Sequence, residues 1–269
     1  SLAAYAGPEL RHSHDIDVLV RQEDRGRAAA VLSDAGFAPM PSRAGTAAGT
    51  TALIDRSHLP LELHTRLYRL PHYDPPLAAV WESAVPWRLG EATLRTLAPE
   101  DHFVYVCGQA ACSASRDTPK WAADAFALAS SPSFAWPRVL ASARAGRLEL
   151  PLSILCAFLA RELELRVPAG VLDELARAAA GADRVAVEVA LTGLRAGRRG
   201  RFRDLFRAAP AWGDRLALAR WMVLPSGAAL RGGEPLPCPR AWPAAYLGRP
   251  LGYLGRRLAA AARAVGGEE

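Results

Sequence analysis

The chain has 269 residues, a hydrophobic content of 51% and a formal net charge of +6, which predict one large or two modest domains around a sizeable core. No apolar run approaches the ~20 residues of a membrane-spanning helix, so we expect no transmembrane segment. The four cysteines show neither metal-ligand spacing nor a disulfide pattern, and a reducing cytoplasm is therefore the expected compartment.

The first predicted strand, residues 15–20, carries two carboxylates in an otherwise apolar run. Side chains two residues apart share one face of a strand, so Asp15 and Asp17 project together while Ile16, Val18 and Val20 point into a core. Two adjacent like charges repel each other, and a bound divalent cation relieves that repulsion at phosphoryl- and nucleotidyl-transfer sites. The alternative is an edge strand on which both carboxylates are merely solvated.

The next elements in the chain are a helix over residues 23–35 that ends at Gly36, and a loop over residues 38–49 that could move over a substrate. Residues 50–55 and 60–67 then form a predicted pair of strands.

In the second strand of this pair Leu61 and Leu63 occupy one face, and Glu62 and His64 the other. If this strand lies beside residues 15–20, Glu62 becomes a third carboxylate of the same site, whereas taken alone it is an ordinary exposed residue. His64 is expected to support the site from a second layer, with direct metal ligation as the alternative.

Residues 87–89 and 92–97 predict a hairpin that turns at Gly90, and after residue 98 the pattern becomes helical. The predicted fold is therefore α/β, with a small mixed sheet in residues 1–97 followed by a mainly helical domain in residues 98–269. Its predicted helices span residues 99–113, 118–130, 136–145, 151–164, 169–180 and 183–194. The Pro/Gly-rich stretch 225–250 is expected to be irregular, and residues 251–265 form a basic amphipathic helix that docks on the domain or touches a membrane surface.

The Asp-x-Asp strand with a third carboxylate on a neighbouring strand resembles the polymerase-beta-like nucleotidyltransferase superfamily. An Arg shortly before the strand, the Leu-Glu-Leu-His segment and the Pro-Glu-Asp segment at residues 99–101 are similar to the bacterial uncharacterised nucleotidyltransferase family. Gln109 stands where such proteins often carry a His, so no role of that His is carried over.

The resemblance implies that Asp15, Asp17 and Glu62 bind Mg²⁺ (or Mn²⁺) and that the enzyme takes a nucleoside triphosphate and an unidentified acceptor. It further implies nucleotide or phosphate binding by a second set of residues, Ser1, Arg11, Lys120 and Asp124. Ser1 matches the Ser of the superfamily's Gly-Ser turn, but no Gly precedes it in the chain. Outside the resemblance, Arg11 would simply pair with Asp15 or another neighbouring acid, and Asp124 with Lys120 four residues away on a helix.

Two other functions stay open. One is a catalytically inactive relative that binds nucleotide or a partner. The other is a toxin-like enzyme that modifies RNA, which an arginine-rich stretch would support. That stretch contains Arg195, Arg198, Arg199, Arg201, Arg203 and Arg207. Nucleic acid is possible but not favoured as a partner, because no platform for stacking bases is evident.

Overall fold

The structure is a computed structural model that describes Tyr5, Arg11, Ser13 and residues 15–40, 50–68, 73–112, 120–180, 211–213, 215 and 216. The chain divides into two compact units. The sheet unit comprises Asp15–Thr65 with Leu216–Glu269, and the helical unit comprises Ser1–His14 with Arg66–Arg215. The predicted division into a domain of residues 1–97 and a domain of residues 98–269 remains a prediction.

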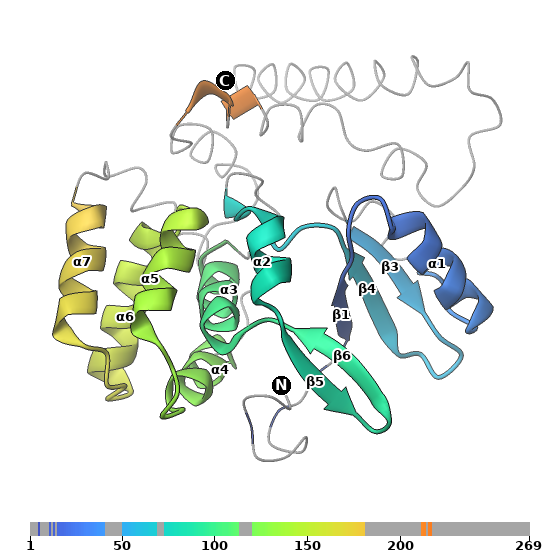
Figure 1. The fold of residues 1–269 in the computed structure, drawn as a ribbon, viewed down its shortest axis with the longest axis horizontal. Coiled ribbons are helices and arrows are strands. Elements are labelled where there is room, and N and C mark those ends of the chain that lie inside the picture. Colours follow the sequence, from blue (N-terminus) through green and yellow to red (C-terminus); the bar gives the residue numbers. More distant parts are fainter. Residues whose placement is uncertain are drawn as a thin grey trace, which may run out of the picture. The chain divides into compact units, whose positions relative to one another are not determined.

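Among its described residues, the sheet unit contains four strands and one helix (Figure 1). These are β1 (Ile16–Leu19), α1 (Arg25–Asp34), β2 (Ala38–Pro39), β3 (Thr50–Ile54) and β4 (Pro60–His64). The strand order is β1-β4-β3-β2, in which β1 runs parallel to β4 and the other pairs are antiparallel. The small mixed sheet and the pairing of the strands around residues 56–58 are therefore as the sequence predicts.

One face of this sheet forms the apolar core of the unit. Leu53, Leu61 and Leu63 are buried there, and apolar residues of β1 and α1 pack against them. Because side chains alternate along a strand, the polar residues between these leucines lie on the opposite face. The prediction that Ile16 points into the core is wrong, since this side chain is 42% exposed. Ile16 is the first residue of an edge strand, and the packed residues of β1 are Val18 and the following Val20.

From residue 77 the described part of the helical unit forms a short helix, a hairpin and then successive helices (Figure 1). Its elements are α2 (Leu77–Ser83), β5 (Val85–Leu89), β6 (Ala92–Thr96), α3 (Pro99–Cys112), α4 (Lys120–Ala129), α5 (Trp136–Ala145), α6 (Glu149–Glu162) and α7 (Ala169–Ala179). The hairpin turns at Gly90, which has a φ of 61°. Helix α2 was not predicted, because seven residues are too few to display a helical period.

Helix α3 is central to the packing of this unit. The fully buried Phe103 contacts Phe134 and Trp136 edge-on, with ring centroids 5.5 Å away in both cases. On the same helix, Gly108 lets the ring of Tyr68 approach so closely that a Cβ at position 108 would lie 2.6 Å from it. Tyr68 in turn donates a hydrogen bond from its hydroxyl to the carbonyl oxygen of Val104, at 3.1 Å. Gln109 donates to the carbonyl oxygen of Leu67 at 2.8 Å, so it has a structural contact of its own.

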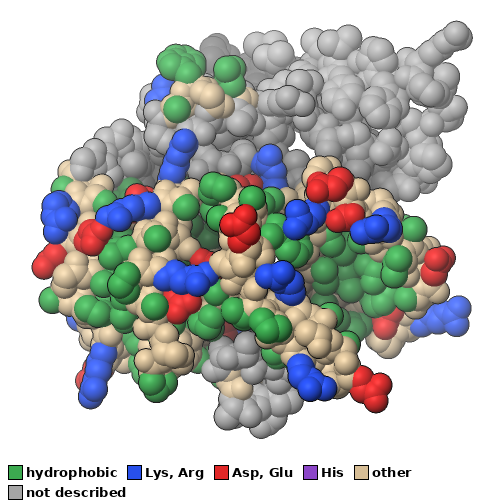
Figure 2. Space-filling model, in the orientation of Figure 1, with side chains coloured by type: hydrophobic (Ala, Val, Ile, Leu, Met, Phe, Trp, Pro, Cys, Tyr) green, Lys and Arg blue, Asp and Glu red, His purple; other side chains and the backbone are tan. Residues whose placement is uncertain are grey.

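The surface of the described chain carries charges of both signs. On the face drawn in Figure 2, basic and acidic side chains are interspersed among apolar ones in each unit. Within the described ranges, no helix is both long enough and apolar enough to cross a membrane. The predicted helix 183–194, the arginine-rich stretch 195–207, the Pro/Gly-rich stretch 225–250 and the amphipathic helix 251–265 lie outside the described residues.

Candidate metal centre

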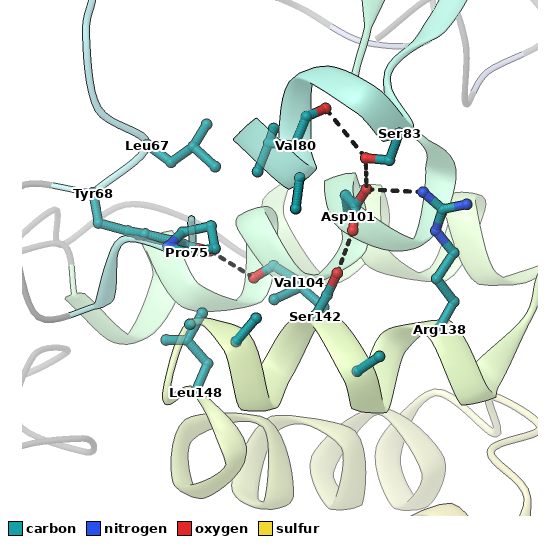
Figure 3. A pocket seen from close by; sticks show the side chains of 14 residues that line it. Leu67, Tyr68, Pro75, Val80, Ser83, Asp101, Val104, Arg138, Ser142 and Leu148 are labelled. Carbon is teal, nitrogen blue, oxygen red and sulfur yellow. Dashed lines mark hydrogen bonds and ion pairs between the residues drawn. The ribbon is translucent and has the colours of Figure 1, made fainter. Parts of the chain in front are cut away.

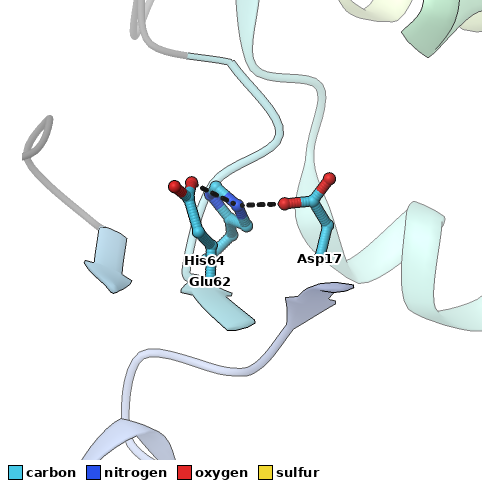
Figure 4. A group of neighbouring side chains, drawn as sticks. All are labelled: Asp17, Glu62 and His64. Carbon is cyan, nitrogen blue, oxygen red and sulfur yellow. Dashed lines mark hydrogen bonds and ion pairs between the residues drawn. The ribbon is translucent and has the colours of Figure 1, made fainter. Parts of the chain in front are cut away.

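The parallel pairing of β1 with β4 brings two carboxylates together. In this register Asp17 is the neighbour of Glu62, and both side chains leave the sheet on the face opposite the leucine core. Glu62 is 15% exposed and Asp17 is 54% exposed, so one carboxylate is largely shielded while the other meets solvent. The two carboxylates thus form a negatively charged pair on two adjacent strands (Figure 4).

His64 lies beside these carboxylates and contacts both. Its Nε2 is 3.0 Å from Oδ1 of Asp17 and 3.4 Å from Oε2 of Glu62. Its Nδ1 is 3.2 Å from Oγ1 of Thr50, the residue opposite His64 on β3. The imidazole therefore bridges a hydroxyl on one side and two carboxylates on the other.

Asp17, Glu62 and His64 form the one group of potential metal ligands found among the described residues, and their ligand atoms lie within 4.8 Å of one another. Metal–ligand bonds of about 2.0–2.2 Å place neighbouring ligands about 3 Å apart, so the 3.0 and 3.4 Å separations of His64 Nε2 from the two carboxylates suit a single divalent cation. Two carboxylates and an imidazole are also a donor set that divalent metals accept. These residues therefore fit the metal that the sequence predicts.

Asp15 is not in this group of three. It precedes β1, which begins at Ile16, so the regular alternation that would align it with Asp17 is not imposed on it. Asp15 is partly buried and has interactions of its own.

Comparison with protein families identifies the chain. Residues 1–164 match the family described as "Uncharacterised nucleotidyltransferase". The chain belongs to this family. It is accordingly a nucleotidyltransferase, a transferase, as the sequence predicts, and the acidic group on β1 and β4 is its candidate metal centre. No curated protein and no solved structure matches the chain.

Arg11 and Asp124 of this nucleotidyltransferase are bound to each other. The Arg11 Nε and Nη2 atoms donate to the two carboxylate oxygens of Asp124 at 3.0 and 2.9 Å, and the Tyr5 hydroxyl donates to the same carboxylate at 2.7 Å. Burial opposes ionisation of Asp124, but the bonds from Arg11 and Tyr5 outweigh it and hold its pKa below the ordinary value. Burial and the bond to Asp124 raise the pKa of Tyr5 to about 12. The three residues tie the segment before β1 to helix α4.

The structure says less about the other predicted phosphate-binding residues, Lys120 and Ser1. Lys120 is the first residue of α4 and is partly buried, while Ser1 lies outside the described residues. Trp121 packs against Phe158 of α6 with ring centroids 5.7 Å apart, which is the core role expected of it when taken alone. Arg11 is paired with an acid, but the acid is Asp124 on α4 and not Asp15 or another neighbour in sequence.

The helical unit also contains a pocket of about 290 Å³, lined mainly by apolar residues that include Tyr68, Val80 and Leu148 (Figure 3). At its polar corner Asp101 accepts hydrogen bonds from Ser83 at 2.6 Å, from Arg138 at 3.2 Å and from Ser142. These bonds join α2, α3 and α5. Asp101, the Asp of the Pro-Glu-Asp segment, therefore has a structural role. None of the predicted site residues lines this pocket.

Thr50 is the residue of the candidate site that the sequence analysis missed. The sequence pattern predicts only that Thr50 belongs to the first strand of a pair, without a residue opposite it. The signal was nevertheless present, because a hairpin centred on residue 57 pairs position 50 with position 64, as the structure does. Assigning the register would have placed a hydroxyl beside His64.

Proposed function

We propose that this protein is a metal-dependent enzyme that transfers a nucleoside monophosphate from a nucleoside triphosphate to an acceptor, with release of pyrophosphate. The observation that carries the proposal is the adjacency of Asp17 and Glu62 on paired parallel strands, in a chain that belongs to a nucleotidyltransferase family. The acceptor would present a hydroxyl or a phosphate oxygen, and we propose a small molecule or a peptide.

In this proposal Asp17 and Glu62 hold Mg²⁺ or Mn²⁺, with Asp15 as a further carboxylate at the start of β1. The bound cation would neutralise charge on the triphosphate and polarise the phosphorus–oxygen bonds. The carboxylates orient it by their fixed positions on two adjacent strands. Glu62, the more shielded carboxylate, either completes the metal site or accepts the proton of an acceptor hydroxyl.

The bond changes follow from in-line substitution at the α-phosphorus. The acceptor oxygen forms a bond to this phosphorus, and the bond from the phosphorus to the oxygen that bridges the α and β positions breaks. Pyrophosphate leaves with the electron pair of that bond, and the acceptor proton passes to a carboxylate. Positioning and charge stabilisation account for most of the catalysis in such reactions.

Phosphate binding by Ser1, Arg11, Lys120 and Asp124 remains a proposal that rests on the family resemblance. The bidentate pairing of Arg11 with Asp124 supports a positioning role for these two residues. Lys120, the only lysine in the chain, is then the first cation to test for contact with phosphate. Lys120→Ala should weaken triphosphate binding and leave the melting temperature of the unliganded protein nearly unchanged.

The decisive experiment measures thermal stabilisation by Mn²⁺ or Mg²⁺ together with a non-hydrolysable nucleoside triphosphate. A ligand that binds only the native state at 100 times its dissociation constant adds about 2.7 kcal/mol to the free energy of unfolding. The Asp17→Asn/Glu62→Gln double variant should lose this stabilisation and any pyrophosphate release. Asp15→Asn, measured alone, tests whether the carboxylate before β1 contributes.

Asp34→Asn is the matched control, because it removes one negative charge from an exposed position at the end of α1 in the same unit. This control should keep the full stabilisation. An equal shift in the double variant and the control would contradict the metal assignment. Stabilisation by nucleotide without pyrophosphate release from any acceptor tested would instead favour an inactive nucleotide-binding module.

A further inference from the structure

The imidazole of His64 contacts more carboxylates than a histidine that only orients one of them would require. A histidine that only orients a carboxylate requires one contact with it, whereas His64 Nε2 lies within 3.0–3.4 Å of two carboxylates on two different strands. Separations of about 3 Å are those between neighbouring ligands of one cation with bonds of about 2.1 Å. Two of the three pairs of ligand atoms therefore have the spacing of neighbouring ligands, and all three atoms lie within 4.8 Å of one another (Figure 4).

The Thr50 hydroxyl is compatible with either tautomer of His64, whose Nε2 faces the carboxylates. This hydroxyl lies 3.2 Å from Nδ1 and, like any hydroxyl, can either accept or donate a hydrogen bond. When it accepts from Nδ1–H, the lone pair of Nε2 points at two carboxylate oxygens, which is favourable only with a cation among them. When it donates to Nδ1, the Nε2–H bonds to Asp17 instead. The same contact thus serves both the metal-bound and the metal-free arrangement.

We infer that His64 is a direct metal ligand through Nε2, that Thr50 positions it, and that the centre consequently prefers Mn²⁺ to Mg²⁺. Mg²⁺ is a hard cation that binds oxygen ligands and keeps several waters. Mn²⁺ also binds carboxylates. As a transition-metal ion, it accepts a nitrogen ligand more readily than Mg²⁺ does. The inference rests on the proposed function, since it concerns the metal of the same site.

Two measurements on the purified protein test this inference without any need for an acceptor. The first is the electron spin echo modulation of bound Mn²⁺, which reveals a directly coordinated ¹⁴N nucleus. The second is calorimetric titration with Mn²⁺ and with Mg²⁺. The wild-type protein should show the ¹⁴N coupling and bind Mn²⁺ more tightly than Mg²⁺.

His64→Asn should abolish the coupling and weaken Mn²⁺ binding by at least about tenfold, with a smaller effect on Mg²⁺. Thr50→Val should reduce the preference for Mn²⁺ while keeping a β-branched residue in β3. His58→Asn is the matched control, because His58 is exposed and has a φ of 64°, a conformation that Asn tolerates. It should leave the coupling and both affinities unchanged.

The outcomes separate this inference from the proposed function. If Mn²⁺ binds in a manner that depends on Asp17 and Glu62 but shows no ¹⁴N coupling that His64→Asn removes, His64 is not a ligand and the metal-dependent function stands. If neither cation binds, both fail. If His64→Asn does not fold, the wild-type protein labelled with ¹⁵N-histidine still decides, because a coordinated imidazole changes its modulation pattern and an uncoordinated one does not.

Discussion

The two units of this chain differ in their buried side chains and in their candidate metal ligands. Among its described residues the sheet unit has a small core of Leu53, Leu61 and Leu63, and helix α1 contributes no buried residue to it. The helical unit buries many large side chains completely, among them Phe103 and Leu159. The candidate metal ligands nevertheless lie in the sheet unit, on the face opposite its core.

This difference has a physical reason. A cation site needs several partly exposed carboxylates close together, and such an arrangement opposes folding until the cation binds. A small sheet can present these groups because only one of its faces has to be apolar. The helical unit has no such group among its described residues. Its Asp101 joins helices to one another, and its Asp124 joins α4 to the segment before β1.

The largest expected effect is in the core of the helical unit. Phe103→Ala removes a fully buried ring that contacts Phe134 and Trp136, and should lower the free energy of unfolding by about 3–5 kcal/mol in urea denaturation. Val31→Ala in α1, where the side chain is 62% exposed, should change it by less than about 0.5 kcal/mol. Equal changes in the free energy of unfolding for the two variants would contradict the difference in core packing between the two units.

The second effect is a pH dependence that arises in the helical unit. Burial lowers the pKa of His102 from 6.5 to about 4; the charge of nearby Asp124 opposes this shift and that of Arg11 adds to it. Between pH 6.5 and about 4 the unfolded chain binds a proton that the folded chain does not, so stability should fall as the pH is lowered through this window. The shift corresponds to about 3 kcal/mol at most.

His102→Phe should flatten the stability curve between pH 6.5 and 4, measured by denaturation at successive pH values. His58→Asn, at an exposed position of the sheet unit, should follow the wild-type curve. If the wild-type and His102→Phe curves run parallel through this window, His102 is not held neutral by the folded protein.

The third prediction compares two helical glycines. Gly108→Ala places a methyl group 2.6 Å from the buried Tyr68 ring, which is expected to cost about 1–3 kcal/mol of stability in spite of the better helix propensity of alanine. Gly26→Ala in α1 meets nothing within 4 Å and should stabilise the protein slightly. Thermal denaturation should therefore give shifts of opposite sign, and a shift of the same sign would contradict the close packing.

The smallest effect is expected in the turn between β3 and β4. Backbone and side-chain hydrogen bonds, from Leu59 and then Ser57, hold the pKa of Asp55 below its ordinary value. Asp55→Ala should lower the melting temperature at pH 7 by less than Gly108→Ala does. This difference from wild type should shrink as the pH falls below 3.8, because the carboxylate then loses its charge in both states. Asp34→Ala, at an exposed position, should show no such pH dependence.

Local pattern determined much of this protein. The alternation of Leu61, Glu62, Leu63 and His64 placed a carboxylate and an imidazole on one face, as the structure shows. The five helices α3 to α7 begin and end close to the predicted residues, since proline, glycine and helical periodicity act within one segment. Membership of the nucleotidyltransferase family could likewise be inferred from short sequence motifs alone.

Only the tertiary structure decided which residues from distant segments become neighbours. The pairing of β1 with β4 makes Asp17 the neighbour of Glu62, although 44 residues separate them, and it leaves Asp15 outside the group of three. The contact of Thr50 with His64 depends on the register of a hairpin, and that of Arg11 with Asp124 joins residues 113 positions apart. Sequence periodicity orients a side chain relative to its own strand or helix, but packing and hydrogen-bond register alone select the partner that it meets.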